Sequence, residues 1–248
     1  MATLFISDLH LDQSRPAVTG LFLQFLRAQA TQAEALYILG DLFEAWVGDD
    51  EDGDLATAVR GGLRQLVASG VPVFVMRGNR DFLLGPGFAA ETCAQLLPDP
   101  CVIRLHDEPT LLMHGDLLCS DDASYLAFRA QVRDPAWQQH FLAQPLPARW
   151  AFAETARAGS QQHQGSLREA GELESITDVN PQTVDDVMRL FGVNRLIHGH
   201  THRPAFHPLR RGQVTALRIV LGDWHEQGSV LTATRDGMEL STLPQGLL

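Results

Sequence analysis

Five short apolar runs divide the chain, at residues 4–6, 37–39, 73–76, 111–113 and 196–197. Each run is followed shortly by side chains that can bind a metal ion. Strands buried in parallel sheets appear as continuous apolar runs, and glycine lets the chain turn sharply where a strand ends. The pattern therefore predicts buried strands whose ends bring these polar side chains together.

Segments with helical spacing of apolar residues lie between the runs. Residues 16–30 and 55–68 each predict a helix, and Gly70 ends the second. The pair Asn180-Pro181 is typical of a helix start, and that helix should end near Phe191. Alternating strands and helices of this kind predict an α/β fold.

Further runs predict antiparallel strands in the second half of the chain. Residues 101–105 and 109–113 should form a pair joined by a short turn. The tail contains runs at 216–221, 230–234 and 238–243, which we expect to pair and to extend a second sheet.

The stretch from about 122 to 174 breaks this pattern, because helix formers dominate it and β-branched residues are few. We expect a helical insertion within a single domain spanning 1–248, rather than a second domain. An insertion of this length near a site is the usual position of a lid. Two interpretations of its large apolar residues remain open, a small core of their own or the wall of an apolar pocket; the residues are Trp137, Phe141, Leu142, Leu146, Trp150 and Phe152.

Composition limits the kinds of partner and compartment. A content of 45% hydrophobic residues over 248 positions supports a sizeable core, and a formal net charge of -11 argues against a nucleic-acid-binding surface. Three cysteines without zinc-finger spacing fit a reducing compartment. No apolar run approaches the roughly 20 residues of a membrane helix, so we expect a soluble cytoplasmic protein.

The polar residues after the first two runs have the chemistry of metal ligands. In extended geometry Asp8 and His10 point to the same side, as His200 and His202 do further along the chain. A surface turn is the alternative interpretation of an isolated Asp-x-His. Asp41 is the natural shared ligand, because a carboxylate has two oxygens whereas an imidazole offers one lone pair to one metal.

The later runs add neutral and basic groups. Asn79 offers a carbonyl oxygen suited to a divalent ion, and the planar donors of Arg80 match phosphate oxygens, although an ion pair with Asp81 is the alternative for Arg80. His114 repeats the pattern of strand, ligand and glycine. Asp122 either caps the next helix or reaches a substrate.

In order, D-x-H, G-D, G-N-R-D, H-G-D and G-H-T-H resemble the motifs of the calcineurin-like metallophosphoesterase superfamily. The resemblance covers nearly the whole chain. It implies a four-layer αββα sandwich of two mixed sheets, here with a helical lid insertion. A non-catalytic scaffold on this fold would be expected to lack ligands, and none is missing.

A sharper resemblance is to the branch of this superfamily that hydrolyses UDP-2,3-diacylglucosamine. That branch carries Arg at the position of Arg80, where most relatives carry His. The matching segments are GDLFEAW at 40–46, GNRDFLLG at 78–85, HGD at 114–116 with Asp121-Asp122, DVN at 178–180 and IHGHTHRP at 197–204.

This resemblance implies two divalent metal ions with Mn²⁺ as the implied species, although nitrogen and oxygen ligands alone also accept iron or zinc. One ion would be held by Asp8, His10, Asp41 and His202, and the other by Asp41, Asn79, His114 and His200. It implies catalytic roles for Asp41, Asn79, Arg80, His114 and His200, and substrate contacts for Asn79, Arg80, Asp122, Ser160 and His200.

One stretch departs from the family pattern. The family continues from the lid Ser to an Asn or Thr and then a Lys, and this Lys is absent after Ser160. Gln164 and Arg168 are the candidates to replace the two contacts.

The implied reaction is cleavage of the substrate diphosphate by water that two metal ions activate, with attack at the α phosphorus. The products would be UMP and 2,3-diacylglucosamine 1-phosphate, known as lipid X in lipid A synthesis. A lipid-linked nucleotide sugar also implies peripheral contact with the cytoplasmic side of the inner membrane. The alternative is another metallophosphoesterase, acting on cyclic nucleotides or phosphoproteins, which would need no acyl pocket.

Overall fold

Two mixed β-sheets lie at the centre of the computed structural model, which describes residues 2–171, 176–211, 214–225 and 227–244. The first sheet has the strand order β11-β10-β1-β2-β3-β4, in which β1 to β4 run parallel and β10 is antiparallel to β1. Its strands are β1 (Thr3–Ile6), β2 (Ala35–Leu39), β3 (Val73–Met76), β4 (Gln95–Leu97), β10 (Gln227–Ala233) and β11 (Met238–Pro244).

The second sheet has the order β5-β6-β7-β9-β8. Here β6, β7 and β9 run parallel, and β5 and β8 are antiparallel strands at the two edges. Its strands are β5 (Cys101–Leu105), β6 (Glu108–Met113), β7 (Arg195–His198), β8 (Ala205–Arg211) and β9 (Val214–Val220).

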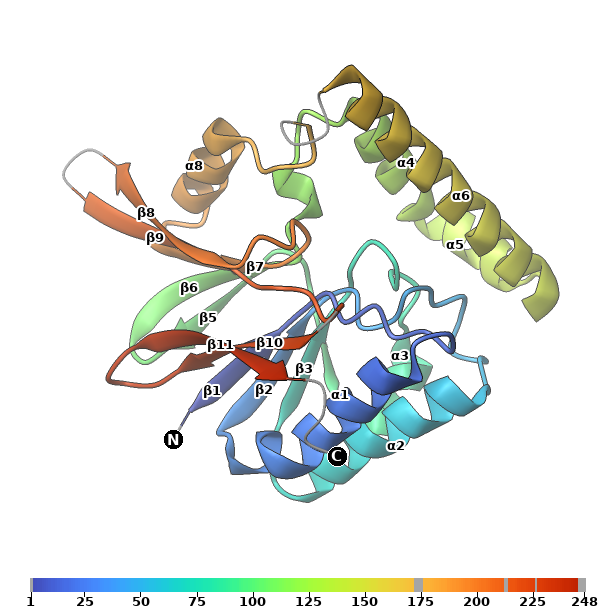
Figure 1. The fold of residues 1–248 in the computed structure, drawn as a ribbon, viewed down its shortest axis with the longest axis horizontal. Coiled ribbons are helices and arrows are strands. Elements are labelled where there is room, and N and C mark those ends of the chain that lie inside the picture. Colours follow the sequence, from blue (N-terminus) through green and yellow to red (C-terminus); the bar gives the residue numbers. More distant parts are fainter. Residues whose placement is uncertain (1, 172–175, 212–213, 226, 245–248) are drawn as a thin grey trace.

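Side-chain alternation along the strands produces the four predicted layers. Phe5 points from β1 into the core between the sheets, whereas its neighbours Leu4 and Ile6 point the other way, into the core under the helices. Those helices are α1 (Pro16–Ala28), α2 (Asp54–Ala68) and α3 (Pro86–Thr92), and α8 (Pro181–Leu190) covers the outer face of the second sheet (Figure 1).

The prediction that the tail strands extend one sheet is wrong in part. β9 joins the second sheet, but β10 and β11 cross back and pair beside β1 in the first. Val230 and Leu231 of β10 are buried in different cores, so this strand needs an inner position with both faces covered. β8 was not predicted, because it contains Pro208 and alternates in exposure, as edge strands tolerate.

The described part of the stretch where we expected a helical insertion contains three helices: α4 (Ala123–Val132), α5 (Pro135–Leu142) and α6 (Leu146–Ala170). We call them the helical segment. Trp137 stacks on Phe141 with ring centroids 4.8 Å apart, and both rings contact Phe152. Phe141 and Trp137 also pack against the main core, so these aromatic residues do not form a separate core, and their role as a pocket wall remains a prediction. The role of this segment as a lid within one domain remains a prediction, and residues 172–175 lie outside the described ranges. Over the described ranges, no helix has the length and apolar character needed to cross a bilayer.

A buried arginine attaches α6 to the loop that follows β2. Arg149 is only 2% exposed. Its Nη1 donates to the carbonyl of Val47 at 2.6 Å and to Asp50 Oδ1 at 2.8 Å, and its Nε donates to the carbonyl of Gln144 at 3.0 Å. A guanidinium tolerates burial here because several of its donors have acceptors.

We expect Arg149→Met to lower the free energy of unfolding by about 1–3 kcal/mol, because buried carbonyl groups lose their donors. Urea denaturation monitored by circular dichroism measures the change. Arg64→Met is the matched control, since Arg64 is exposed on α2 and its loss should change stability by less than about 0.5 kcal/mol. Equal effects of the two substitutions would contradict the anchoring role.

Candidate metal centre

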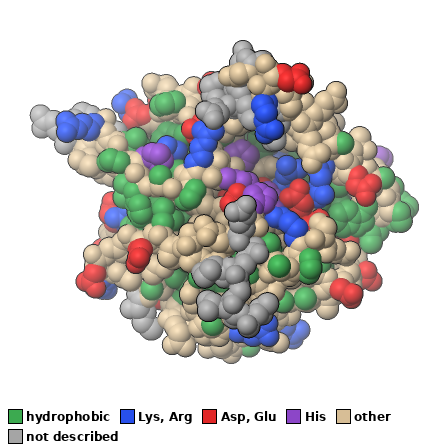
Figure 2. Space-filling model, viewed as in Figure 1, with side chains coloured by type: hydrophobic (Ala, Val, Ile, Leu, Met, Phe, Trp, Pro, Cys, Tyr) green, Lys and Arg blue, Asp and Glu red, His purple; other side chains and the backbone are tan. Residues whose placement is uncertain are grey.

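The carboxyl ends of strands from both sheets meet at one place. β1, β2 and β3 are parallel neighbours in the first sheet, and β6 and β7 are parallel neighbours in the second. The residues that follow them therefore converge, as the apolar runs predicted. Histidine side chains gather near the middle of this face of the molecule, with acidic and basic side chains around them (Figure 2).

The first group of donor atoms comes from the loops after β1 and β7. His10 Nε2 lies 3.3 Å from His202 Nε2, and His202 Nε2 lies 3.4 Å from Asp8 Oδ1. Asp41 Oδ2 is 3.7 Å from His10 Nε2. Three of these residues are buried and His202 is partly buried.

The second group lies on the other side of Asp41. Asn79 Oδ1 is 2.8 Å from His114 Nε2 and 2.9 Å from His200 Nδ1. His114 Nε2 is in turn 3.8 Å from Asp41 Oδ1. The two oxygens of Asp41 therefore face different groups, which is the geometry expected of a bridging carboxylate.

The donor set fits a pair of divalent cations. Asp8 Oδ1 is buried and accepts no hydrogen bond from any residue that the structure describes. Such an oxygen is costly to bury unless something else binds it. Carboxylate, amide and imidazole donors together suit Mn²⁺, Fe²⁺ or Zn²⁺. Which atoms hold which ion remains a prediction.

The local backbone differs from the extended geometry that we expected. Five candidate ligands have left-handed backbone conformations, with φ of 55° at Asp8, 49° at His10, 53° at Asp41, 70° at His200 and 53° at His202. Each costs of order 1–3 kcal/mol and persists only where the surroundings enforce it. His200 and His202 consequently face different groups, whereas the extended geometry would have placed them on one.

Two close approaches explain why glycine flanks the ligands. A Cβ on Gly78 would lie 2.0 Å from Asp41 Oδ1, and a Cβ on Gly199 would lie 2.3 Å from Asp8 Oδ2. No side chain fits at these distances. Gly78 thus lets the loop after β3 touch Asp41 after the neighbouring β2, and Gly199 lets the loop after β7 in the second sheet touch Asp8 after β1 in the first.

Asp81 organises two of these loops and was missed as a site residue. Its buried carboxylate accepts backbone N–H groups from Gly78 and Leu42, both at 2.7 Å, and a weaker one from Asp41 at 3.3 Å. Burial first, and then the charge of Asp41, raise the pKa of Asp81 to about 6. The sequence offered one signal, an acidic residue three positions after a loop glycine.

The backbone contacts of Asp81 also bear on Arg80. Among the described residues no ion pair joins the two, and the buried Nε of Arg80 has no hydrogen-bond partner. The alternative in which Arg80 simply pairs with Asp81 therefore finds no support, and a guanidinium donor beside the centre remains available to a ligand.

Comparison with known proteins identifies the family. A model of the calcineurin-like phosphoesterase family matches residues 1–204. The chain belongs to the calcineurin-like phosphoesterase family. A curated relative from Xanthomonas axonopodis pv. citri (strain 306), named UDP-2,3-diacylglucosamine hydrolase, is 58% identical over 98% of this chain and 99% of its own length. A relative of the same name from Stenotrophomonas maltophilia (strain K279a) is 57% identical over the same shares. A solved archaeal phosphodiesterase is 10% identical over 98% of this chain and 100% of its own, with a TM-score of 0.49.

In this calcineurin-like phosphoesterase three of the candidate ligand imidazoles have an oxygen atom close to Nδ1, the ring nitrogen that faces away from the centre. His10 Nδ1 lies 2.8 Å from Glu44 Oε2, and His202 Nδ1 lies 3.1 Å from Asp223 Oδ2. His114 Nδ1 lies 2.9 Å from the carbonyl at the end of β2. Contacts of this kind fix the tautomer and orientation of metal-binding histidines. Sequence reasoning did not identify either acidic residue.

The helix α4 is attached to the loop after His114. Tyr125 Oη and Arg129 Nε donate to Asp116 Oδ2, at 2.5 and 2.6 Å. Asp122 caps α4 by accepting the backbone N–H of Tyr125 at 2.9 Å, so the capping alternative for Asp122 is confirmed. A further substrate contact by Asp122 remains a prediction.

The substrate-contacting candidates Ser160, Gln164 and Arg168 all belong to α6. Their spacing of four residues places them along one side of the helix. The side chain of Gln164 lies outside the described part of the structure, and the roles of all three remain predictions. All 19 Lys and Arg residues of the chain are arginine, and Arg168 remains the candidate to replace the lysine of the family pattern.

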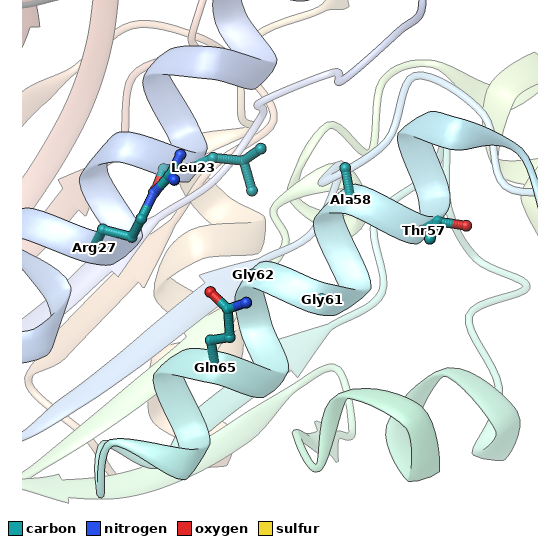
Figure 3. Close-up of a pocket in the computed structure, with 7 residues that line it drawn as sticks. All are labelled: Leu23, Arg27, Thr57, Ala58, Gly61, Gly62 and Gln65. Atoms are coloured by element: carbon teal, nitrogen blue, oxygen red, sulfur yellow. The ribbon is translucent and has the colours of Figure 1, made fainter.

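A surface groove between α1 and α2 is separate from the metal centre. It has a volume of about 260 Å³ and is lined by Leu23, Arg27, Thr57, Ala58, Gly61, Gly62 and Gln65 (Figure 3). The helices approach closely beside it, since a Cβ on Gly62 would lie 2.7 Å from Leu23 Cδ2. None of its lining residues is a candidate site residue.

The protonation of the imidazoles predicts how metal binding depends on pH. Burial alone would lower the pKa of His114, but neighbouring carboxylates, Asp41 foremost, raise it to about 9. Burial likewise opposes charge on His202, while Asp223 and Asp8 raise its pKa to about 10. Both imidazoles are therefore protonated at neutral pH in the metal-free protein and must lose their protons to become ligands.

We expect the apparent affinity for Mn²⁺ to rise as the pH increases from about 6.5 to about 8, with roughly one to two protons released per binding event near neutral pH. Calorimetric titration in buffers of different ionisation enthalpy counts these protons. The dependence should fade above the pKa values of about 9 and 10. An affinity that does not change over this range would show that metal binding displaces no proton from these two imidazoles.

Proposed function

We propose that this protein hydrolyses the diphosphate of UDP-2,3-diacylglucosamine to UMP and 2,3-diacylglucosamine 1-phosphate. The observation that carries the proposal is a complete set of seven candidate ligands in two groups that share Asp41. The substrate assignment rests on relatives named UDP-2,3-diacylglucosamine hydrolase, which match 98% of the chain at 57–58% identity.

Two divalent ions, with Mn²⁺ as the proposed species, would lower the pKa of a water and neutralise charge that develops on the phosphoryl oxygens. Asp8, His10, Asp41 and His202 would hold one ion, and Asp41, Asn79, His114 and His200 the other. Three free cysteines agree with the proposed reducing, cytoplasmic location.

The chain's own residues would bind and orient the diphosphate. The Arg80 guanidinium would donate to phosphoryl oxygens that gain charge in the transition state. Asn79, through its amide nitrogen, and His200 lie on the same side of Asp41 and would complete the contacts. The backbone N–H of Arg80 donates to Asp41 Oδ1 at 2.8 Å, so this residue is held beside the bridging carboxylate.

The acyl chains would contact the helical segment. Phe82, Tyr125, Phe128 and Val132 lie around a cavity beside Asn79, but its volume is only about 10 Å³. That volume holds about one water, so acyl chains entering at this point would require the helical segment to move. Its exposed Phe128, Leu142 and Phe152 support the proposed peripheral contact with the inner membrane, where the lipid substrate resides.

Hydrolysis of UDP-2,3-diacylglucosamine in heavy-oxygen water, with Mn²⁺ present, tests the proposal. Attack at the α phosphorus joins the water oxygen to that phosphorus and breaks its bond to the bridging oxygen, which leaves with the lipid phosphate. The label should therefore appear in UMP. Label in the lipid product would place the attack on the other phosphorus, and cleavage of cyclic nucleotides or phosphopeptides in place of this substrate would favour the alternative phosphoesterase.

We expect Arg80→Ala to reduce kcat by about 10²–10³, the usual loss for one charged donor to the transition state, while metal content stays at the wild-type level. Asp41→Asn is the comparison variant, because it should lose metal from both groups together with activity. Inductively coupled plasma mass spectrometry and steady-state kinetics separate the two behaviours. Loss of metal from Arg80→Ala would mean that this arginine supports the fold of the centre instead.

A further inference from the structure

Glu44 lies between the metal centre and the helical segment. Its Oε2 is 2.8 Å from His10 Nδ1, an ion-pair distance without the alignment of a hydrogen bond, and its Oε1 is 3.3 Å from Arg157 Nε. Arg157 belongs to α6, and its Nη2 also lies 3.8 Å from Asp12 Oδ2. One half-buried carboxylate therefore contacts a candidate ligand with one oxygen and the helical segment with the other.

The contact with Glu44 determines how His10 faces the centre. The backbone of His10 is fixed in the left-handed conformation, and its N–H donates to the carbonyl of Asp41 at 2.9 Å. With Nδ1 turned to Glu44, the other ring nitrogen, Nε2, points to Asp41 and His202. A carboxylate behind an imidazole is a known means of fixing the tautomer that binds a cation.

Other contacts between α6 and the core do not involve a candidate ligand. Arg149 contacts the loop at Val47 and Asp50, and Trp150 Nε1 donates to Glu51 Oε2 at 2.8 Å. Among the polar contacts of the described part of α6, only the pair of Arg157 with Glu44 reaches a residue that touches a candidate ligand. The contacts of Arg157 with Glu44 and of Glu44 with His10 therefore form a direct path from α6 to a candidate ligand.

We propose that Glu44 is a positioning residue that couples docking of α6 to metal binding, by orienting His10 with one oxygen and receiving Arg157 with the other. The proposal rests on the ligand role of His10 under the proposed function. Docked α6 holds Glu44 in place, Glu44 holds His10, and the bound cation in turn favours that arrangement. Because such coupling is reciprocal, metal binding must also stabilise docked α6.

The test measures Mn²⁺ affinity and backbone hydrogen exchange in α6 of the full-length protein, each with and without Mn²⁺. In the wild type, Mn²⁺ should slow exchange in α6. Glu44→Ala should weaken Mn²⁺ binding by about 10–100-fold, the usual effect of removing a carboxylate behind a metal-bound histidine. Glu44→Gln keeps an acceptor for His10 and should recover much of this loss, while the effect of Mn²⁺ on α6 stays absent.

Arg157→Met separates coupling from simple support of the fold, because Arg157 touches no candidate ligand. It should weaken Mn²⁺ binding several-fold in the wild-type background, and should have no further effect in Glu44→Ala. Trp150→Phe is the matched control: it removes another contact between α6 and the core, so α6 should exchange faster while Mn²⁺ affinity is unchanged.

Two results would overturn the coupling while leaving the proposed function intact. One is an active, metal-loaded Arg157→Met protein with wild-type Mn²⁺ affinity. The other is slowing of α6 exchange by Mn²⁺ that persists in Glu44→Ala. A wild-type protein that binds no Mn²⁺ and hydrolyses no UDP-2,3-diacylglucosamine would instead overturn the proposed function and the coupling with it.

Discussion

The carboxylate of Asp41 is the one group that both halves of the candidate centre share. Its two oxygens can face opposite ways only because the backbone after β2 turns into the left-handed region and because Gly78 leaves room beside Oδ1. Asp81 fixes both loops by accepting their N–H groups. The geometry of the ligands thus depends on backbone constraints that lie outside the ligands themselves.

The centre buries several acidic groups, and their negative charge must be compensated by positive charge nearby. Asp8, Asp41, Asp81 and Asp116 are each 2% exposed or less. Burial favours neutral carboxyl groups, yet nearby imidazoles hold the pKa of Asp8 below its usual range. In the metal-free protein, protons on His114 supply positive charge. Divalent ions can replace those protons without leaving the carboxylates uncompensated, which is a physical reason for this fold to select cations.

The apolar runs were sufficient to predict the strands that carry the ligands, because a buried parallel strand has a continuous apolar signature. They could not specify which sheet a strand joins. The apolar residues of β10 indicate that both of its faces are buried, but not which strands pair beside it. The ligands were visible because each lies within four residues of a strand end and belongs to a motif of the family. The roles of Glu44 and Asp223 were not visible. The contact of Glu44 with His10 and that of Asp223 with His202 depend on how the loops fold, which the sequence pattern does not give.

The α4 side of the centre constrains how a bulky substrate can bind. Tyr125 and Arg129 attach α4 to Asp116, and Arg133 Nη2 donates to the carbonyl of Gly78 at 2.8 Å. The cavity between α4 and Asn79 has room for about one water, so an acyl chain can enter only if α4 shifts. That shift would strain the contact between Arg133 and the carbonyl of Gly78, and Gly78 directly precedes Asn79 in the chain. Binding energy from the acyl chain, which is remote from the phosphorus, would therefore act on the candidate ligand Asn79. Binding energy can assist the reaction only when it reaches the reacting centre in this way.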